Sequence, residues 1–393
     1  MPELPPVTVV VLNFDGREHL GPCLDSLRRL EYPAGAVTIH LVDNGSRDGS
    51  VAMVARCYPE VRITAFPENR GFSAAVNHAV QAATTPLVAL LNNDTRVDPR
   101  WLAELVGPVV RGEAAAAGAR IVDWQGRRDL FQAGGCNFHG IGFQAGLHGM
   151  TRDGAPAGPA EVLFACGAAM AIRRDLFLEV GGFDEDFFAF YEDVDLGWRL
   201  WVLGHRVVVV PAAVVYHRHS ATASRVPLHQ LRVLHVRNPL LTILKNYEQD
   251  HLARIFPAAL LLSIRRMSFL ANLDPEPYRI ERPAARRPRG RWRWWGRRAA
   301  GDERVALSRV ALSDLIALED VNRQFARFLE KRAVIQAARR RRDREIFPLF
   351  RAPFWAVEQA EDYLGLQNCL LDHFGIRPLF APGAPADTGA PAG

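Results

Sequence analysis

The chain has 393 residues, of which 49% are hydrophobic and 23% are charged, and its formal net charge is +5. This composition excludes a disordered chain and supplies enough apolar side chains for two or three domains with a large core. Five widely spaced cysteines without a Cys-x-x-Cys pair favour neither a disulfide framework nor a zinc knuckle, so we expect a reducing cytoplasm.

The ends and apolar runs of the chain bear on its location. The N-terminus shows no basic segment and no cleavage signal of the secretory kind. The longest apolar run of the C-terminal half, residues 255–264, contains Pro257 and is well short of the ~20 residues that span a bilayer. We therefore expect a soluble or peripheral protein.

Apolar runs alternate with helical spacings over the first hundred residues. Residues 7–12 are mostly β-branched and end at a polar turn, as in a buried parallel strand. Four leucines at helical spacing follow before Pro33. The order repeats, with strands predicted at 37–42, 61–65 and 87–91 and helices at about 50–57 and 73–82. This alternation predicts an α/β fold, a doubly wound and mostly parallel sheet flanked by helices.

The middle of the chain is less regular. Residues 112–159 are glycine-rich, with short strands expected at 117–122 and near 138–143. Beyond them we expect a strand-like run at 162–172, a short helix at 173–177, a helix at 194–203 and a strand at 207–210. The compact α/β unit is expected to close near Arg225.

The last third has a different composition. Amphipathic helices are predicted at 228–247, 251–270 and about 305–342, with an Arg/Trp-rich stretch before the third. Residues 381–393 are rich in Pro, Ala and Gly and are expected to be disordered. We therefore divide the chain into an α/β domain at 1–225, a helical C-terminal region at 226–380 and a tail at 381–393.

Polar turns follow two predicted strands, and a third acidic cluster stands further along. Residues 43–50 follow one strand and residues 92–95 follow another; the carboxyl ends of parallel strands line one crevice, so both turns should face a single cleft. Glu192, Asp193 and Asp195 crowd together after a Gly-Gly-Phe-Asp turn. Such crowding is costly unless a cation or substrate compensates it. The alternative is a solvated acidic helix start.

Four motifs in fixed order carry a family resemblance. Together they resemble the family 2 glycosyltransferases, which are inverting enzymes of the GT-A fold, and above all the rhamnosyltransferase-like and galactofuranosyltransferase-like bacterial members. The resemblance covers roughly residues 7–220 and implies a GT-A catalytic domain at 1–225. The motifs are Val42-Asp43-Asn44-Gly45-Ser46, Asn69-Arg70-Gly71-Phe72, Asn92-Asn93-Asp94 and Tyr191-Glu192-Asp193-Val194-Asp195.

The resemblance implies a nucleotide-sugar site. A carboxylate such as Asp43 can accept a hydrogen bond from the imide N–H of uracil or thymine, and Gly71 would let the backbone approach the diphosphate. An ordinary Asn-Gly turn is the alternative for residues 43–45. The implied binding residues are Asn13, Asp43, Asn69, Arg70, Gly71, Asn93 and Asp94.

Residues 92–94 stand at the place of the family's Asp-x-Asp motif, which holds Mg²⁺ or Mn²⁺ against the sugar diphosphate. Because Asn92 replaces the first aspartate, the cation should bind less tightly and depend more on the phosphates. Asp94 is the expected carboxylate ligand. His217 matches the histidine that completes the metal shell in related galactofuranosyltransferases. The alternatives are that His219 takes this place, or that neither histidine belongs to a site.

Inverting chemistry needs one base to take a proton from the acceptor hydroxyl while the nucleoside diphosphate leaves from the opposite face. Asp193 matches that base by resemblance, and Glu192 would orient it or bind the acceptor. Gly167, Asp195 and Trp198 are the expected acceptor contacts, although Asp195 could instead cap the following helix.

The C-terminal third fits a membrane surface. Apolar residues at 255–270 beside arginines suit an interfacial helix, and tryptophans among arginines suit a headgroup layer. Nucleic-acid binding and a helical dimer contact are the alternatives. We favour the membrane because the resemblance implies an enzyme class with lipid-linked acceptors. The residues concerned include Arg254, Arg265, Arg266, Trp292, Trp294 and Trp295.

The sequence therefore predicts a metal-dependent inverting hexosyltransferase that moves a sugar, with rhamnose one candidate, from a dTDP-, UDP- or GDP-linked donor. The acceptor would be a cell-envelope glycan or glycolipid, nucleic acid is not expected as a partner, and the location would be the cytoplasm or the cytoplasmic face of the inner membrane. The alternatives are a non-catalytic nucleotide-sugar-binding protein and a sugar nucleotidyltransferase. The second lacks a Gly-rich phosphate loop near the N-terminus.

Overall fold

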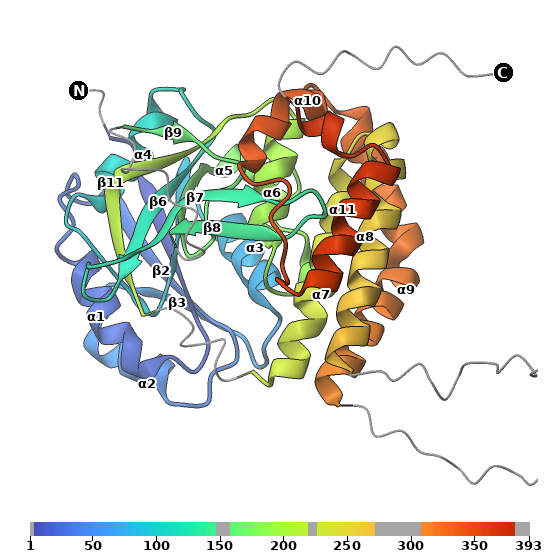
Figure 1. Ribbon diagram of the computed structural model, residues 1–393. Coiled ribbons are helices and arrows are strands. Elements are labelled where there is room, and N and C mark those ends of the chain that lie inside the picture. The colour runs from blue at the N-terminus through green and yellow to red at the C-terminus, as the bar shows by residue number, and fades with distance from the viewer. Residues whose placement is uncertain (1–3, 147–157, 219–225, 272–307, 382–393) are drawn as a thin grey trace, which may run out of the picture.

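The computed structural model describes residues 4–146, 158–218, 226–271 and 308–381. A mixed sheet with helices on its faces forms one side of the molecule, and the helices of the C-terminal third pack together on the other side (Figure 1). The predicted α/β fold with a helical C-terminal region is confirmed. The predicted tail at 381–393 and the Arg/Trp stretch lie outside the described residues, except for Ala381.

The sheet is built outward from β1 (Val7–Asn13), which carries the most completely buried valines. It pairs in parallel with β2 (Val37–Asp43) and with β4 (Leu87–Asn92), and β2 pairs in parallel with β3 (Arg62–Ala65). The predicted alternation of strand and helix is therefore confirmed here. The intervening helices are α1 (Arg17–Leu27), α2 (Ser50–Cys57) and α3 (Phe72–Ala82).

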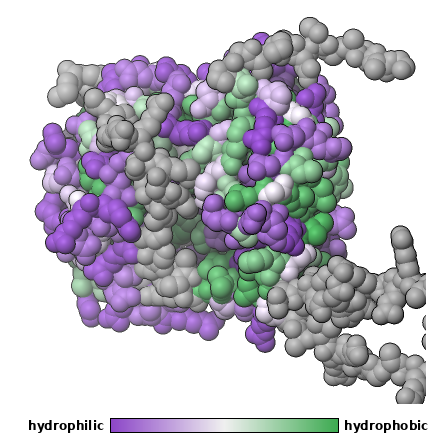
Figure 2. Space-filling view, in the orientation of Figure 1, coloured by the Kyte–Doolittle hydropathy of each residue, from purple (hydrophilic) through white to green (hydrophobic). Residues whose placement is uncertain are grey.

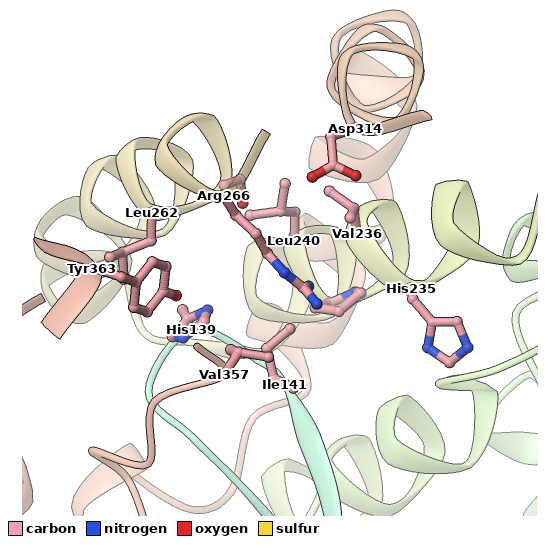
Figure 3. Close-up of a pocket in the computed structure, with 12 residues that line it drawn as sticks. His139, Ile141, His235, Val236, Leu240, Leu262, Arg266, Asp314, Val357 and Tyr363 are labelled. Atoms are coloured by element: carbon pink, nitrogen blue, oxygen red, sulfur yellow. The ribbon is translucent and has the colours of Figure 1, made fainter. Parts of the chain in front are cut away.

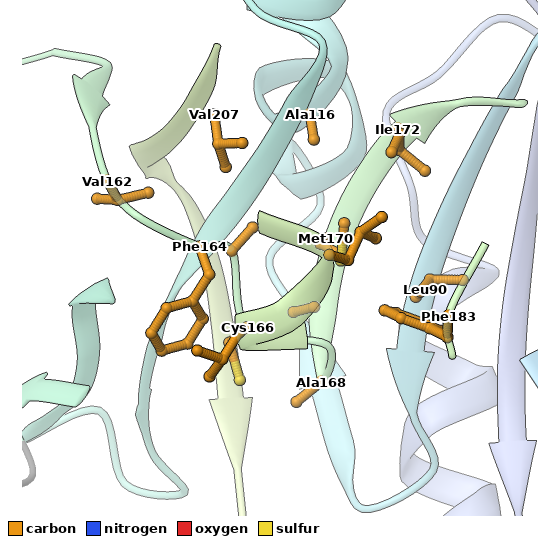
Figure 4. Packing of buried hydrophobic residues seen from close by; sticks show 14 of the residues in the cluster. Leu90, Ala116, Val162, Phe164, Cys166, Ala168, Met170, Ile172, Phe183 and Val207 are labelled. Carbon is orange, nitrogen blue, oxygen red and sulfur yellow. The ribbon is translucent and has the colours of Figure 1, made fainter. Parts of the chain in front are cut away.

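An antiparallel strand joins the two halves of the sheet. β10 (Ala169–Arg173) lies between β4 and β6 (Ala116–Asp123) and runs against both. Figure 4 shows Met170 and Ile172 of β10 in the buried cluster that also contains Leu90 of β4 and Ala116 of β6. The remaining strands are β5 (Thr95–Val97), β7 (Asp129–Cys136), β8 (Gly142–Gly146), β9 (Ala160–Glu161) and β11 (Val207–His217).

Two predictions for the middle of the chain are wrong. Residues 137–141 form the turn between β7 and β8 instead of a strand, and Gly140 takes a φ of 88° in that turn. The run 162–172 is only partly extended, because residues 162–168 leave the sheet as an irregular buried segment before β10 begins. The prediction also missed α4 (Trp101–Val110), whose apolar residues cover the sheet.

The C-terminal helices share one buried core with the sheet. α7 packs against α6 and α9, and its residues Leu240, Leu241 and Ile243 belong to the same buried cluster as the strands. The division at residue 225 stays a prediction, and α6 and α7 meet across it. The helices are α5 (Arg174–Glu179), α6 (Glu192–Val202), α7 (Leu228–Asn246), α8 (Gln249–Leu270), α9 (Arg309–Ala337), α10 (Asp343–Ile346) and α11 (Glu361–His373).

No helix within the described ranges is both long enough and apolar enough to cross a bilayer.

Candidate active site

Three of the predicted site residues lie in a row at the carboxyl edge of the sheet. Strand register places Asn13 of β1 opposite Asp43 of β2, and Leu12 opposite Asn92 of β4. The Asn13 side-chain amide donates to Asp43 Oδ1 at 2.7 Å, and Asn93 Nδ2 donates to Asn13 Oδ1 at 2.6 Å. Asn13, Asp43 and Asn93 thus form one chain of hydrogen bonds, and all three are buried.

This chain orients the Asp43 carboxylate. Its Oδ2 atom also accepts from the backbone N–H of Ser46 at 2.9 Å, so the turn after β2 and Asn13 hold the carboxylate from two sides. The Ser50 hydroxyl, 3.5 Å from Oδ1, is a third donor. A carboxylate has about four acceptor positions, so Asp43 keeps the capacity to accept one further hydrogen bond. Within this arrangement Asn93 donates a hydrogen bond to Asn13, and Asn13 donates one to Asp43.

A second network ties residues 69–71 to the end of β2. Asn44 Nδ2 donates to Asn69 Oδ1 at 2.9 Å, and Asn44 Oδ1 accepts from the backbone N–H of Arg70 at the same distance. Gly71 has a φ of 85°, and a Cβ there would lie 2.6 Å from the carbonyl oxygen of Phe188. Glycine is therefore required here by the close approach of Phe188, in addition to any ligand. The sequence analysis missed Asn44, although its place directly after Asp43 could have indicated it.

Asp94 and His217 come together from distant parts of the chain. His217 lies at the end of β11 opposite Thr95, and its Nε2 atom is 3.0 Å from Asp94 Oδ1. Burial raises the pKa of the Asp94 carboxyl, but the hydrogen bond from His217 and its charge outweigh that effect and hold the pKa below its ordinary value.

These two donor atoms fit a divalent cation. Neighbouring ligands of an octahedral ion with bonds of about 2.1 Å lie about 3.0 Å apart, which is the separation found here. Asn92 lies at the start of the same turn. His219, the alternative histidine, lies outside the described residues.

A second group of possible ligands, Glu248, His251 and Asp343, is better explained as a structural contact. Asp343 Oδ2 accepts from the Glu248 backbone N–H at 2.7 Å and lies 2.8 Å from His251 Nδ1, and its Oδ1 accepts from Arg339. Glu248 accepts in turn from Arg342 and from the Asp343 backbone. Because donors already surround both carboxylates, this group joins the start of α8 to α10.

The predicted base lies at the first turn of α6. Asp193 Oδ2 accepts from the backbone N–H of Gly167 at 2.9 Å, and Asp193 Oδ1 accepts from Val194 N–H at 2.8 Å. Burial raises the pKa of Asp193, and these two N–H groups oppose the shift.

Glu192 differs from its neighbour. It is buried, and its Oε2 atom has no hydrogen-bond partner among the described residues. Burial and the adjacent Asp193 carboxylate raise the pKa of Glu192 well above its ordinary value. Both pKa values are therefore raised by burial, and that of Glu192, which also faces the Asp193 carboxylate, is raised more strongly.

The base and the predicted metal turn are close neighbours in the sheet. Asn92 N–H donates to the Ala168 carbonyl at 3.0 Å, and the next residue back, Gly167, holds Asp193. A Cβ on Gly167 would lie 3.5 Å from the Phe72 ring and 3.6 Å from Asp193 Cβ. The donor side at residues 71–72, the metal turn and the base thus meet at Gly167.

Asp195 and Trp198 do not support acceptor contacts, which corrects the sequence-based expectation. Asp195 is fully buried, and its carboxylate accepts from Lys245 at 2.9 Å and Asn246 at 3.1 Å, besides Arg199. Trp198 is also fully buried, with its ring 4.7 Å from that of Tyr247 and 5.0 Å from that of Phe350. Both face the C-terminal helices, so an acceptor cannot reach them.

Cys166 lies two residues before Ala168 and is buried. Burial raises the pKa of its thiol, so the thiolate that a nucleophile requires is disfavoured. This agrees with the expectation that no covalent intermediate on Cys166 is needed.

A separate hollow lies among the C-terminal helices and the β7–β8 turn (Figure 3). Arg266 reaches into it, but its guanidinium is paired with Glu358 at 2.7 Å. Burial lowers the pKa of His139 to about 3, so its ring is neutral. None of the predicted site residues lines this hollow, and we assign it no role. Its lining includes His139, Ile141, His235, Leu240, Arg266 and Tyr363.

Comparisons with known proteins agree with this geometry. Residues 8–181 match the family model described as "Glycosyl transferase family 2". An N-acetylglucosaminyl-diphospho-decaprenol L-rhamnosyltransferase of Mycobacterium tuberculosis is 29% identical over an alignment 259 residues long, which covers 58% of this chain and 80% of that protein. A pre-mycofactocin glycosyltransferase of the same organism is 31% identical over 201 residues, 49% of this chain and 40% of that protein.

The fold has a solved counterpart. The crystal structure of GalNAc-T7 with UDP, GalNAc and Mn²⁺ aligns with a TM-score of 0.52 at 16% identity, covering 71% of this chain and 54% of that one. At this identity the match supports the fold, and the predicted GT-A architecture is confirmed.

Replacing the predicted metal ligands should weaken binding of Mn²⁺. We expect Asp94→Asn and His217→Ala to raise the Kd for Mn²⁺ by about tenfold or more, because the first replaces a charged carboxylate by a neutral amide and the second removes the imidazole nitrogen. Isothermal titration with MnCl₂ measures this, and His373→Ala on exposed α11 is the control for adventitious histidine binding. Equal affinities in all four proteins would rule out a metal site at Asp94 and His217.

Removing the charge of Asp195 should destabilise the protein. Asp195→Asn would leave buried Arg199 without a carboxylate and Lys245 with Asp184 alone, and we expect a loss of about 3–5 kcal/mol in the free energy of unfolding. Urea denaturation measures it. Asp175→Asn, which breaks an exposed pair with Arg173, should cost about 0.5 kcal/mol or less. Similar values for the two variants would contradict a structural role for Asp195.

Proposed function

We propose that this metal-dependent glycosyltransferase, whose residues 8–181 form a family 2 glycosyltransferase domain, transfers its sugar with inversion. The sugar would move from a nucleoside diphosphate to a glycan or lipid-linked acceptor. The observation that carries the proposal is the Asp193 carboxylate, which two backbone N–H groups hold beside Gly167 and the 92–94 turn. The activities of the relatives are properties of those proteins, and the donor and acceptor here are proposals.

The proposed chemistry is a single displacement. Asp193 takes the proton of the acceptor hydroxyl, the hydroxyl oxygen forms a bond to the anomeric carbon, and the bond from that carbon to the diphosphate breaks on the opposite face. The electron pair leaves with the nucleoside diphosphate. Glu192, whose pKa is raised more strongly, can in its protonated form donate a hydrogen bond to the sugar or the acceptor from its unpaired side.

The donor would lie along the carboxyl edge of the sheet. Asp43, fixed by Asn13 and by Ser46, has one acceptor position left for the imide N–H of a uracil or thymine base. Asn69, Arg70 and Gly71 would line the diphosphate, with the Asn44 network keeping them in place. The Arg70 side chain is exposed, and its guanidinium lies over the Phe66 ring, 4.9 Å from the ring centre.

Asp94 and His217, with Asn92, would hold the divalent cation. When bound, the cation neutralises the charge that develops on the departing diphosphate. The imidazole nitrogen of His217 favours Mn²⁺ over Mg²⁺, since Mg²⁺ prefers oxygen ligands.

We propose rhamnose from dTDP-rhamnose as the donor sugar and a polyprenyl-diphosphate-linked N-acetylglucosamine as the acceptor. The support is the Mycobacterium tuberculosis rhamnosyltransferase, 80% of whose length aligns with this chain. The proposed setting is cell-envelope polysaccharide synthesis at the cytoplasmic face of the inner membrane.

A lipid-linked acceptor requires an approach to the bilayer, and we propose that the end of the α8–α9 pair makes it. Apolar side chains are exposed where α8 ends and α9 begins: Ile264, Phe269, Leu312, Leu315 and Ile316. Phe256 of α8 contacts Phe325 of α9, and the two helices lie side by side in Figure 1, so these residues share one end of the pair. Figure 2 shows hydrophobic residues gathered over the helical side and mainly hydrophilic ones over the sheet side.

The composition of the adjoining chain supports this surface. Residues 272–307, which connect α8 to α9, contain Trp292, Trp294, Trp295 and ten arginines, although they lie outside the described residues. The expectation that α8 itself is an interfacial helix needs correction. Arg265 and Arg266 pair with Asp362 and Glu358, and Ile255 and Leu262 are buried inside the protein.

The decisive test of function is transfer of radiolabelled rhamnose from dTDP-rhamnose, with Mn²⁺, to a short-chain polyprenyl-diphospho-N-acetylglucosamine. We expect turnover by the wild type and a loss of at least about a thousandfold in Asp193→Asn, since a general base contributes about 10²–10⁴-fold. Because the base must be ionised and its pKa is raised, kcat/KM should fall as pH drops through a value above the ~4 of a free carboxyl.

A parallel binding measurement separates an enzyme from a non-catalytic binder. UDP, dTDP and GDP, each with and without Mn²⁺, should be compared for their effect on Tm; a ligand at 100 times its Kd adds about 2.7 kcal/mol. A Mn²⁺-dependent shift that Asp193→Asn preserves, without turnover by the wild type, would favour the binder. A shift with UDP or GDP alone would replace the proposed donor.

Membrane binding should depend on the exposed end of α8 and α9. Leu315→Asp combined with Ile316→Asp removes two half-exposed apolar side chains, at roughly 1 kcal/mol each, so partitioning should weaken about thirtyfold. Flotation with vesicles of phosphatidylcholine and phosphatidylglycerol measures this. Val334→Asp, equally apolar and exposed but near the other end of α9, is the control. Flotation that is unaffected by the double change, or absent in the wild type, contradicts the proposal.

A further inference from the structure

The segment that leads into the predicted base has an unusual backbone. Phe188, Phe190 and Tyr191 have φ values of 63°, 65° and 69°, in the left-handed region that side chains other than glycine rarely occupy. Each such residue costs about 1–3 kcal/mol and persists only when its surroundings hold it. Tyr191 directly precedes Glu192 and Asp193, so whatever holds this segment also sets the position of the base.

Asn238, in the middle of α7, holds it. Its Nδ2 atom donates to the carbonyl oxygens of Phe187 at 3.1 Å, Ala189 at 3.0 Å and Phe190 at 2.8 Å. Asn238 is fully buried, and these carbonyls point inward to one amide. The neighbouring Arg237 adds bonds to the carbonyls of Asp186 and Phe187. The two N–H groups of one side-chain amide are thus shared among three carbonyls, at the end of the 3-10 turn Glu185–Phe187 and in the irregular residues after it.

Further along α7, two side chains also bind a residue that follows the predicted base on α6. Lys245 and Asn246 donate to Asp195, which lies on α6 two residues after Asp193, and Lys245 reaches Asp184 as well at 2.7 Å. Asn238, Lys245 and Asn246 stand seven and eight residues apart, two helical turns, so they share a face of α7. This polar face contacts the chain immediately before and after the pair Glu192 and Asp193.

The segment held by Asn238 also touches the donor side. The backbone N–H of Ser73, at the start of α3, donates to the Phe188 carbonyl at 3.3 Å, and Gly71 leaves room for that carbonyl. Residues 187–191 therefore lie between α7 and residues 71–73. A shift of this segment would move the base relative to the donor, while the 43–50 and 92–94 turns, which it does not support, would stay in place.

We propose that Asn238 is a positioning residue for the reaction: its amide holds residues 187–191, among which Phe188, Phe190 and Tyr191 are left-handed, and so aims the Asp193 carboxylate at the acceptor hydroxyl. This inference rests on the proposed function for the role of Asp193. It assigns the C-terminal helical region a part in transfer itself, besides any part in membrane contact.

Asn238→Asp tests the proposal, because it keeps the shape of the side chain and replaces the donor by oxygen atoms facing three carbonyls. Asn238→Ser, which keeps one donor and brings in no charge, serves if the first variant does not fold. Thr242→Val is the matched control, since Thr242 is equally buried one turn away on α7 and bonds only to the Asn238 carbonyl of its own helix.

We expect amide hydrogen exchange of residues 186–193 to quicken about tenfold or more in Asn238→Asp and to stay unchanged in Thr242→Val. The Mn²⁺-dependent rise in Tm with dTDP should be preserved in both. In rhamnose transfer, kcat should fall about a hundredfold in Asn238→Asp with KM for dTDP-rhamnose within about threefold of wild type, the pattern of a displaced catalytic group.

Two results would overturn the proposal: unchanged exchange of residues 186–193, or a loss of activity matched by an equal loss of dTDP binding, which would indicate general destabilisation. If the wild type transfers nothing from dTDP-rhamnose, the proposed donor and acceptor fail. The exchange measurement then still decides whether Asn238 holds the segment.

Discussion

The hydrogen bond from Gly167 N–H to the Asp193 carboxylate is the contact on which the arrangement of the active edge depends. It joins two parts of the fold: the sheet, through the segment just before β10, and α6, through its first turn. β10 runs antiparallel between β4 and β6, so the chain just before it passes the end of β4, where Asn92 begins the metal turn. This reversed strand brings Gly167, which holds the proposed base Asp193, next to the proposed metal turn.

The carboxyl groups at this edge of the sheet differ in pKa because they have different hydrogen-bond partners. Asp94 has His217 beside it, and its pKa is held low in spite of burial. Asp193 has only backbone N–H groups, and Glu192 lacks even these on one oxygen, so burial raises the pKa of both and most strongly that of Glu192. One region therefore contains a carboxyl group whose pKa is held low, beside His217, and two neighbouring carboxyl groups whose pKa is raised by burial. The Asp195 carboxylate, two residues after Asp193, forms salt bridges with Lys245 and Arg199 instead.

Much of the α/β half could be predicted because its signals are local. The valines of β1 and the Asp-rich turn after β2 sit next to each other in sequence and in space, and the register between strands follows from the parallel alternation. The glycine-rich middle could not be predicted, because the β7–β8 turn depends on contacts with α7, such as the approach of Gly140 to Pro239. For the same reason Asp195 was assigned to the acceptor: three acids in four positions look alike in sequence, and only Lys245, fifty residues later, separates a structural charge from a catalytic one. The polar residues inside the otherwise apolar α7 were the available signal.

Because side chains of α7 hold the loop before α6, the evolution of this enzyme is constrained. A catalytic domain that carried its whole site on the sheet could exchange its C-terminal helices freely, as an independent module. Here Asn238 satisfies carbonyls at 187–190 and Lys245 neutralises Asp184 and Asp195, so the two parts must be inherited together. Chimeras of this chain with its relatives should therefore tolerate junctions after α7 far better than junctions between β11 and α7.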